Sequence, residues 1–385
     1  MTRRLDRCLC LNDFEREARR VLPRPIFGYV HAAAEDRRAF EANYRSFDKY
    51  ALVPRVLVDA TGHHARTALL GQEYGQPFGM APVGLSALYT YRGDVELARV
   101  AAERNIPMVM SSSSLIPMEE VARAHPGAWF QAYLPGDREK MEALVQRILR
   151  AGFKTLVLTV DTPANPNKEA YIRSGFTSPL QLSAGLLWQG ITHPGWSLGT
   201  FLKTLLRHGI PHFENNYATR GVPIIASNVE RSFADRSNLG WDHFARVREM
   251  WPHQLVVKGV LSPQDALRAR ELGADGVILS NHGGRQLDSA VAPLAVLPEA
   301  VRLCPGFPVM VDGGIRRGTD VLKALALGAA FVFVGRPFAY AAATAGRAGM
   351  EKVVDLLAAE IDRSLVMLGV RSTAELTPDC LAEAS

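Results

Sequence analysis

The chain has 385 residues, 48% of them hydrophobic, and its 44 lysines and arginines exceed its 39 aspartates and glutamates by five. This composition can bury a large core, and the lack of any block of like charges argues against a nucleic-acid-binding tail. The mild positive charge suits anionic ligands. Four scattered cysteines exclude a disulfide framework, and neither a secretory signal nor an apolar run of transmembrane length is apparent. We therefore expect a cytoplasmic protein with no nucleic-acid partner and no metal site.

Helical patterns dominate the first part of the chain. Asn12 and Glu15 form a capping-box pattern, and the apolar residues after them recur at helical spacing. A helix is therefore predicted here, ending before Pro23, because proline commonly marks a helix boundary. A second helix is predicted over residues 26–44.

From residue 78 onward, short apolar runs alternate with amphipathic segments of helical length. The eight runs cover residues 78–83, 107–112, 128–133, 155–161, 254–259, 276–282, 308–314 and 331–337, and the segments between them include 94–105, 137–151, 263–272 and 318–327. This alternation favours parallel strands in a closed (β/α)₈ TIM barrel, and we predict one barrel domain over residues 1–385. An open doubly wound sheet is the alternative, but the glycine-rich turn expected after its first strand is absent.

The alternation is interrupted once, after the fourth predicted strand, by a connection covering residues 162–240. Connections of this length usually form lids or other functional insertions. Within residues 178–213, Lys203 and Arg207 are the only full charges among many leucines and two tryptophans. We expect a lid or a subunit contact in a homo-oligomer, or else attachment to a membrane surface through an apolar face.

Active sites of such barrels lie at the carboxyl ends of the strands, and useful side chains follow nearly every predicted strand. Along the chain they are Pro82, Val83, Gly84, Ser111, Gln131, Tyr133, Thr159, Asp161, Lys258, Ser280, His282, Asp312, Gly313, Gly314, Gly335 and Arg336. After the sixth strand, His282 can take a proton near neutral pH, and Arg285 can bind a carboxylate through two hydrogen bonds. A structural turn is the alternative interpretation of this loop.

The loops after strands seven and eight commonly bind phosphate in this fold. Here they carry several glycines together with Arg316 and Arg336, which predicts a phosphate-bearing ligand. Lys258 could place its ammonium group against an electron-rich ring, while Gln131 and Thr159 offer hydrogen bonds to the edge of a heteroaromatic ring. An internal ion pair is the alternative role for Lys258.

Residues 280–288, Ser-Asn-His-Gly-Gly-Arg-Gln-Leu-Asp, and residues 312–318, Asp-Gly-Gly-Ile-Arg-Arg-Gly, resemble motifs of the FMN-dependent 2-hydroxy-acid oxidase and dehydrogenase family. That family includes glycolate oxidase, lactate dehydrogenase and mandelate dehydrogenase. The resemblance extends from about Leu22 to Leu368. It implies a barrel with FMN at its mouth that oxidises an L-2-hydroxy acid to the 2-oxo acid and passes electrons to a quinone, another carrier or oxygen.

The resemblance also implies roles for individual residues. His282 would take the hydroxyl or α-carbon proton, and Asp161 would stabilise its imidazolium; by proximity alone, that carboxylate should raise the histidine pKa. Arg285, Lys168, Tyr29 and Tyr133 would contact the substrate. FMN would be held by Pro82, Val83, Gly84, Ser111, Gln131, Thr159, Lys258, Ser280, Asp312, Gly313, Gly314, Arg316, Gly335 and Arg336.

Three positions bear on specificity. Lys168 stands where the family usually has a second arginine, so the charge is kept and the two-pronged geometry is lost. Ser113 replaces a bulky aromatic residue of some relatives, which predicts a roomier pocket. Gly84 is similar to the glycine of several dehydrogenase members, whereas many oxidases have alanine there, so oxygen need not be the natural acceptor.

Two other functions remain open from the sequence. One is a flavin-dependent isomerase-type, phosphate-binding barrel, and the other is an FMN-binding protein that has lost turnover through Lys168. An apolar face in residues 178–213 would add peripheral contact with the inner face of the membrane.

Overall fold

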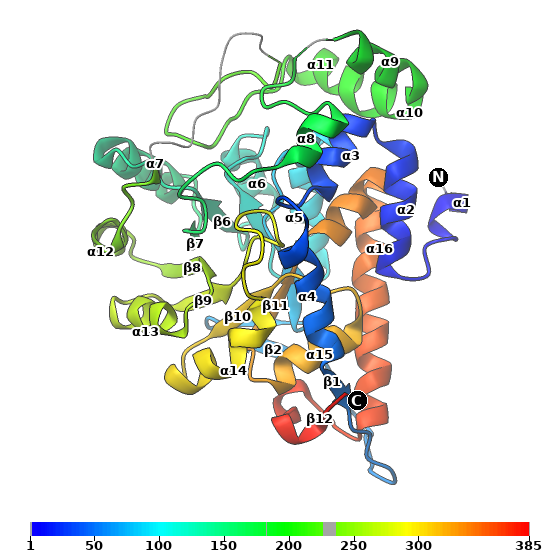
Figure 1. The fold of residues 1–385 in the computed structure, drawn as a ribbon, viewed down its shortest axis with the longest axis vertical. Helices are drawn as coiled ribbons and strands as arrows, with labels where there is room; N and C mark the ends of the chain where they lie inside the picture. The colour runs from blue at the N-terminus through cyan, green and yellow to red at the C-terminus, as the bar shows by residue number, and fades with distance from the viewer. Residues whose placement is uncertain (1, 182, 226–235, 385) are drawn as a thin grey trace.

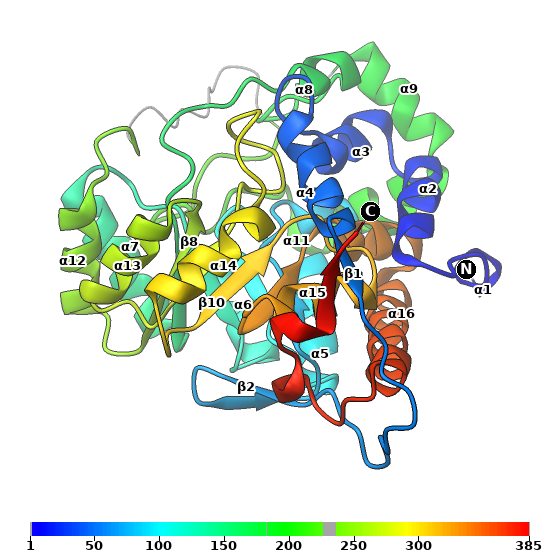
Figure 2. The same ribbon diagram turned by 60° about the horizontal axis from the view of Figure 1, so that its bottom comes forward.

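The computed structural model describes residues 2–181, 183–225 and 236–384, and its centre is a barrel of eight parallel strands (Figures 1 and 2). The hydrogen-bonded order is β4-β11-β10-β9-β8-β7-β6-β5. A parallel bridge between Met80 and Met108 closes the circle, and the Met80 amide donates to the Pro107 carbonyl at 2.9 Å. The closed (β/α)₈ prediction is therefore confirmed, and the open-sheet alternative is wrong.

Each of the eight predicted runs coincides with a barrel strand, and β8 extends one residue beyond its run. The strands are β4 Phe78–Met80, β5 Val109–Ser111, β6 Trp129–Ala132, β7 Thr155–Thr159, β8 Gln254–Val260, β9 Gly276–Leu279, β10 Val309–Asp312 and β11 Phe331–Val334. The principal helices between and after them are α5 Gly93–Glu103, α6 Met118–Ala124, α7 Arg138–Arg150, α12 Trp241–Met250, α13 Pro263–Glu271, α14 Pro293–Leu303, α15 Gly318–Ala326 and α16 Arg336–Leu368.

Large apolar side chains fill the barrel interior. Val157, Ile278 and Met310 from neighbouring strands are fully buried there, and the rings of Trp129 and Phe333 lie 5.4 Å apart. The hairpin of β2, Thr67–Leu69, and β3, Gln72–Tyr74, packs into the same cluster. Because the strands are buried on both faces, they read as continuous apolar runs in the sequence, as expected for a parallel sheet covered by helices.

The N-terminal helices differ from their prediction. Helix α2, Leu11–Val21, ends before Pro23 as expected, but Asn12 lies inside it. The capping carboxylate is that of Asp13, which accepts from the backbone amides of Leu9 and Cys10 at 2.8 and 3.0 Å. The prediction that Asn12 and Glu15 cap the helix is therefore wrong.

The single helix predicted over residues 26–44 is also wrong, because the structure has two helices, α3 Arg24–His31 and α4 Arg38–Asp48. Between them the backbone forms hydrogen bonds with the loop after β9. The Ala34 amide donates to the Gly284 carbonyl at 2.9 Å, and Asp288 accepts from the Ala39 amide at 2.9 Å. Tertiary hydrogen bonds thus break a segment whose composition is helical throughout.

The connection between β7 and α12 contains α8 Glu169–Ser174, α9 Ala184–Thr192, α10 Pro194–Trp196, a π-helical turn Ser197–Leu202 and α11 Lys203–His208. Figure 1 shows α9, α10 and α11 grouped at the top of the molecule. The group is tied to the barrel by the Trp196 indole, which donates to the Leu88 carbonyl at 2.7 Å, and by Gln189, which accepts from the Arg24 amide at 2.8 Å.

Several large side chains of this group face away from the protein. Ile191 and Leu206 are 71% and 78% exposed, and Leu187, Trp188 and Leu198 are exposed as well. In the part of the chain that the structure describes, no helix is both long and apolar enough to cross a membrane.

Candidate active site

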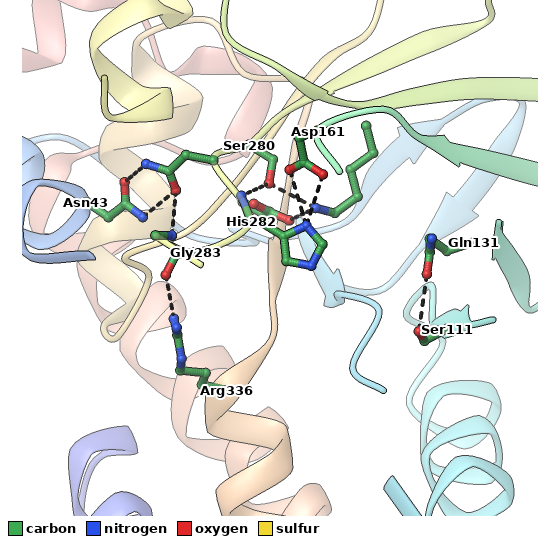
Figure 3. A network of polar contacts seen from close by, with 12 residues as sticks. Asn43, Ser111, Gln131, Asp161, Ser280, His282, Gly283 and Arg336 are labelled. Atoms are coloured by element: carbon green, nitrogen blue, oxygen red, sulfur yellow. Dashed lines mark hydrogen bonds and ion pairs between the residues drawn. The ribbon is translucent and has the colours of Figure 1, made fainter. Parts of the chain in front are cut away.

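A histidine and an aspartate meet at the carboxyl ends of β9 and β7 (Figure 3), and a tyrosine that follows β6 contacts the histidine. Nδ1 of His282 lies 3.0 and 3.2 Å from the two carboxylate oxygens of Asp161. Its other ring nitrogen, Nε2, lies 3.3 Å from the Tyr133 hydroxyl, and the two rings stack at an interplanar angle of 19°. One nitrogen is therefore oriented by a carboxylate, and the other is on the side where a substrate hydroxyl could be bound.

The backbone around the histidine is unusual. His282 has φ +58°, and its amide donates to Oγ of Ser280 at 3.0 Å. Gly284 follows with φ +73°, and a Cβ there would lie 2.4 Å from the backbone nitrogen of Phe40. Only glycine fits this position, because both its conformation and the close approach of α4 exclude a side chain. The loop that carries His282 therefore lies directly against α4.

Burial lowers the pKa of His282 below its ordinary value of 6.5. The Asp161 carboxylate acts in the opposite direction, but desolvation is the larger effect, and Lys258 and Lys168 add to the lowering. The expectation that Asp161 would leave the histidine with a raised pKa is therefore wrong. Desolvation opposes ionisation of Asp161, yet its pKa is lowered by the charge and hydrogen bond of His282. At neutral pH the pair is a neutral imidazole beside a carboxylate, the state that a base requires.

Arg285, three residues after His282 in the same loop, lines the same cavity. Its Nη1 donates to the carbonyls of Tyr29, Val30 and Ala32 at 3.0, 3.2 and 2.9 Å, and its Nη2 donates to the Tyr171 hydroxyl at 2.6 Å. Its guanidinium also lies over the Tyr29 ring at 5.2 Å. The charge is thus fixed in place by α3 and α8, with one of its terminal nitrogens turned toward backbone.

Lys258 forms the internal ion pair that the sequence left open as an alternative role. Its ammonium group forms an ion pair with Asp312 at 2.9 Å and donates to Ser280 at 2.9 Å, so the internal ion pair is present. The side chain nevertheless lines the cavity. A cation held in this way keeps a fixed position beside any ligand in the barrel mouth.

A second concentration of positive charge lies past β10 and β11. The guanidinium of Arg336 donates to the carbonyls of Val30, Gly283 and Ala32, and that of Arg316 contacts the Tyr44 hydroxyl. Burial and the nearby Arg285 lower the pKa of Arg336 to about 10. Two guanidinium groups beside the glycine backbone of residues 313–314 form a site suited to a phosphate dianion.

Several buried polar atoms at the barrel mouth have no hydrogen-bond partner among the residues that the structure describes. They include Nε2 of Gln131 and Oγ1 of Thr159, a donor and a hydroxyl group on adjacent strands. Buried polar groups are nearly always paired in native proteins, so these two atoms suit the polar edge of a bound ring. Together with the phosphate-type site and Lys258, they fit a flavin mononucleotide with its ring over the barrel.

Most of the residues predicted from the sequence line one cavity. Three of the predicted residues lie behind its wall, where Asp161 orients His282, Ser280 contacts Lys258, and Gln131 accepts from Ser111 at 3.2 Å. The cavity wall carries Tyr29, Pro82, Val83, Gly84, Ser111, Tyr133, Thr159, Lys168, Lys258, His282, Arg285, Asp312, Gly313, Gly314, Arg316, Gly335 and Arg336.

Two further residues of the wall, Tyr171 and Arg236, were not predicted from the sequence. Both lie in the long connection after β7, where neither a strand end nor a motif indicates which side chains turn inward. No pattern in the sequence singles them out.

The barrel with a phosphate-type site and a carboxylate-oriented histidine at its mouth defines a flavin-dependent oxidoreductase. The family model described as FMN-dependent dehydrogenase matches residues 18–383, and the chain belongs to that family. It is similar to (S)-mandelate dehydrogenase of Pseudomonas putida, with 37% identity over 96% of this chain and 93% of the relative. It is also similar to L-lactate dehydrogenase of Pectobacterium atrosepticum, with 36% identity over 96% of each chain.

The fold comparison agrees. A crystal structure of monotopic membrane protein (S)-mandelate dehydrogenase superposes with a TM-score of 0.87 at 36% identity, covering 97% of this chain and 99% of the other. The protein is therefore an FMN-dependent enzyme of the 2-hydroxy-acid dehydrogenase family, with FMN as its cofactor.

Proposed function

We propose that this enzyme oxidises an L-2-hydroxy acid with a substituent larger than the methyl group of lactate, and that a quinone in the membrane accepts the electrons. The observation that carries the chemistry is the Asp161–His282 pair at 3.0 Å, with Arg285 and Lys168 on the wall of the same cavity. Oxidising a 2-hydroxy acid needs a base at the reacting carbon or its hydroxyl, a cation on the carboxylate and a two-electron acceptor beside them.

In this proposal the chain's own groups bind the acid and move its proton. Arg285, Lys168 and the Tyr29 hydroxyl bind the carboxylate, and Tyr133 directs the substrate hydroxyl toward Nε2 of His282. Neutral His282 takes the hydroxyl or α-carbon proton, and the Asp161 carboxylate stabilises the imidazolium that results. FMN, when bound, supplies the two-electron acceptor. Lys258, paired with Asp312 on the cavity wall, would supply a positive charge to a flavin ring bound there.

The proposed cofactor contacts follow the walls of the cavity. The backbone of residues 82–84 and the side chains of Gln131 and Thr159 suit the ring, with Ser111 and Ser280 beside them. Asp312, the glycines at 313, 314 and 335, and the guanidinium groups of Arg316 and Arg336 suit the ribityl chain and phosphate.

An anaerobic screen tests the function. Purified enzyme with FMN should lose flavin absorbance when lactate, longer 2-hydroxy acids or mandelate are added without oxygen. If no 2-hydroxy acid bleaches the flavin, the oxidation is refuted; an isomerase-type barrel or a protein without turnover would then account for the bound cofactor.

The pH dependence of flavin reduction should reflect the lowered pKa of His282. Its neutral form is populated above the lowered pKa, so the rate should be constant at neutral pH and fall on the acid side only below pH 6.5. Stopped-flow absorbance across pH 5–9 measures this. Asp161→Asn removes the carboxylate that raises the histidine pKa and should move the acid limb to lower pH. An acid limb above pH 6.5 would contradict the assignment.

The size of the substrate can be tested at Lys168. Its ammonium lies 5.4 Å from the centre of the Tyr171 ring, near the place where Arg285 contacts Tyr171. We expect Lys168→Arg to lower kcat/KM for the native, larger acid, because the planar guanidinium group of arginine occupies more space than the ammonium group of lysine. For small acids such as glycolate, an added charged hydrogen bond should raise kcat/KM. The expected gain corresponds to roughly 1–2 kcal/mol of activation free energy. Uniform improvement on every acid would contradict the proposal of a larger substrate.

The choice of a quinone rests on a further proposal, that the group of helices α9–α11 attaches the enzyme to a membrane surface. Its outward side chains Leu187, Trp188, Ile191, Leu198 and Leu206 form an apolar face on short helices, with Lys203 and Arg207 in the same segment. Such a face can lie in the boundary between headgroups and acyl chains. The relative with the superposable structure is itself named a monotopic membrane protein.

Replacing Leu187, Ile191 and Leu206 by serine should release the enzyme from vesicles containing anionic lipid, measured by co-sedimentation. Anaerobic flavin reduction should stay within a few-fold of the unaltered enzyme, whereas quinone reduction in the vesicles should fall. A matched control is the same change at Val366 and Met367, which are exposed on α16 outside this group. Unchanged sedimentation would refute the attachment, and lost flavin reduction would make the segment a catalytic lid.

A further inference from the structure

Asn43, on α4, is a buried polar residue that the proposed chemistry does not use. Its side chain points toward the loop that carries Ser280 and His282 (Figure 3). Its Nδ2 donates to Oδ1 of Asn281 at 2.8 Å, and Nδ2 of Asn281 donates back to Oδ1 of Asn43 at 2.7 Å. The residue directly before the proposed base is therefore held by a reciprocal pair of buried amides.

The direction of the Asn281 amide is set by its other contacts. Its Oδ1 also accepts from the Gly284 amide at 3.0 Å, and its Nδ2 also donates to the Val291 carbonyl at 3.3 Å. Exchanging the oxygen and the nitrogen would place two donors together at one contact and two acceptors together at the other. Asn43 must therefore present both a donor and an acceptor, which an asparagine side chain supplies and an aspartate does not.

The same residue lies against the loop proposed to hold the cofactor phosphate. A Cβ on Gly313 would lie 3.1 Å from Nδ2 of Asn43, and a Cβ on Gly314 would lie 2.4 Å from the Asn43 carbonyl oxygen. Both glycines have positive φ, +99° and +84°, so their backbone passes α4 where a side chain is excluded. Removing the Asn43 side chain would leave a gap beside Gly313.

Neighbouring residues of α4 contact the same two places. Phe40, one turn before Asn43 on the same face of the helix, closely approaches Gly284 in the loop of the base. Tyr44 contacts Arg316 through its hydroxyl, and its ring centre lies 4.8 Å from the guanidinium carbon. One helix therefore lies against both the loop of the base and the phosphate-type site, and Asn43 is the residue that touches both.

We infer that Asn43 is a positioning residue that joins the phosphate-type site to the loop of His282, so that FMN binding and the orientation of the base depend on one amide pair. The inference rests on the proposed function, in which His282 is the base and residues 312–316 lie at the phosphate. Because Asn43 and Asn281 are each other's partners, losing either amide leaves a buried polar group unpaired and disturbs both loops.

A double-mutant cycle with two readouts tests this. The variants are Asn43→Ala, Asn281→Ala and the two combined. Flavin fluorescence quenching on the apoenzyme gives the FMN affinity, and anaerobic stopped-flow absorbance at saturating FMN gives the rate of flavin reduction by a 2-hydroxy acid. Each single variant should bind FMN about tenfold more weakly and reduce it about tenfold more slowly, the scale of one buried hydrogen bond. The double variant should be no more affected than the worse single variant, because both changes break the same pair.

Asn215→Ala is the matched control. Asn215 is also fully buried, and its side chain donates to the Ile116 carbonyl at 2.8 Å and accepts from the Met118 amide at 2.9 Å, away from both loops. This change should lower the melting temperature and leave both readouts within a few-fold, which separates positioning from general stability. If Asn43→Ala does not fold, Asn43→Asp decides: it keeps the volume but cannot donate to Asn281, and it should slow flavin reduction even at saturating FMN.

A change in only one of the two readouts overturns the inference. Weaker FMN binding with an unchanged rate would make Asn43 a part of the phosphate-type site alone, and a slower rate with unchanged affinity would confine it to the loop of the base. Additive effects of the two single changes would also overturn it, because the amides would then not act as a pair. In these cases bleaching of the flavin by some 2-hydroxy acid leaves the proposed oxidation standing. Failure of every 2-hydroxy acid to reduce the flavin of the unaltered enzyme refutes the proposed function itself.

Discussion

His282→Gln is expected to retain FMN and to reduce it about 10²–10⁴-fold more slowly when substrate is added, because a general base contributes roughly that factor. Glutamine is close to imidazole in reach and keeps a hydrogen-bonding group toward Asp161, but it cannot accept a proton at neutral pH. The phosphate-type site at Arg316 and Arg336 is untouched by the change. Stopped-flow flavin absorbance under anaerobic conditions gives the rate, and the absorbance ratio of flavin to protein gives the cofactor content.

A nearby histidine provides the control for that experiment. His31 lies on α3 and contacts Glu15 at 3.1 Å and the Tyr340 hydroxyl at 3.2 Å, so it is partly buried but is not on the cavity wall. His31→Gln should leave the rate of flavin reduction within a few-fold. If His282→Gln also stays within a few-fold, His282 is not the base.

The barrel could be predicted from the sequence because its strands are covered on both faces. A run such as 155–159 is buried at every position and therefore reads as a strand without any tertiary information. The loop after β9 could also be recognised from the sequence. Its Gly284 is required by a positive φ and by the close approach of Phe40, so the glycine in the motif indicates a constrained loop. The residues that follow the predicted strands then identified many of the side chains that line the cavity.

Other features depend on contacts between residues that are far apart in the sequence, and a local sequence pattern does not reveal such contacts. The break between α3 and α4 arises from hydrogen bonds to residues 284 and 288, about 250 positions away along the chain. The direction of the His282 pKa shift depends on how deeply the Asp161–His282 pair is buried, and burial outweighs the neighbouring charge. Arg236 and Tyr171 line the cavity from the long connection after β7. That connection has no regular hydrophobic pattern from which the direction of its side chains could be predicted.

Arg336 gives the second large effect, on the cofactor itself. The residue is the first of α16 and lines the cavity, and its guanidinium donates to the carbonyls of Val30, Gly283 and Ala32. Arg336→Glu replaces a cation by an anion beside the proposed phosphate position, and it also leaves those carbonyls facing a carboxylate. Losing one charged hydrogen bond to phosphate weakens binding by about 1.5–3 kcal/mol, and repulsion adds to that.

We therefore expect Arg336→Glu to be purified with little or no FMN and to bind added FMN at least about 100-fold more weakly, the factor that corresponds to roughly 2.7 kcal/mol. Flavin fluorescence quenching measures the affinity. Arg363→Glu makes the same change at an exposed position of the same helix and should bind FMN normally. Since the buried glutamate could also destabilise the fold, Arg336→Gln separates the two effects: it removes the charge without repulsion and should show an intermediate affinity. Full FMN retention in both Arg336 variants would exclude this guanidinium from the phosphate site and leave Arg316 as its remaining arginine among the predicted cofactor contacts.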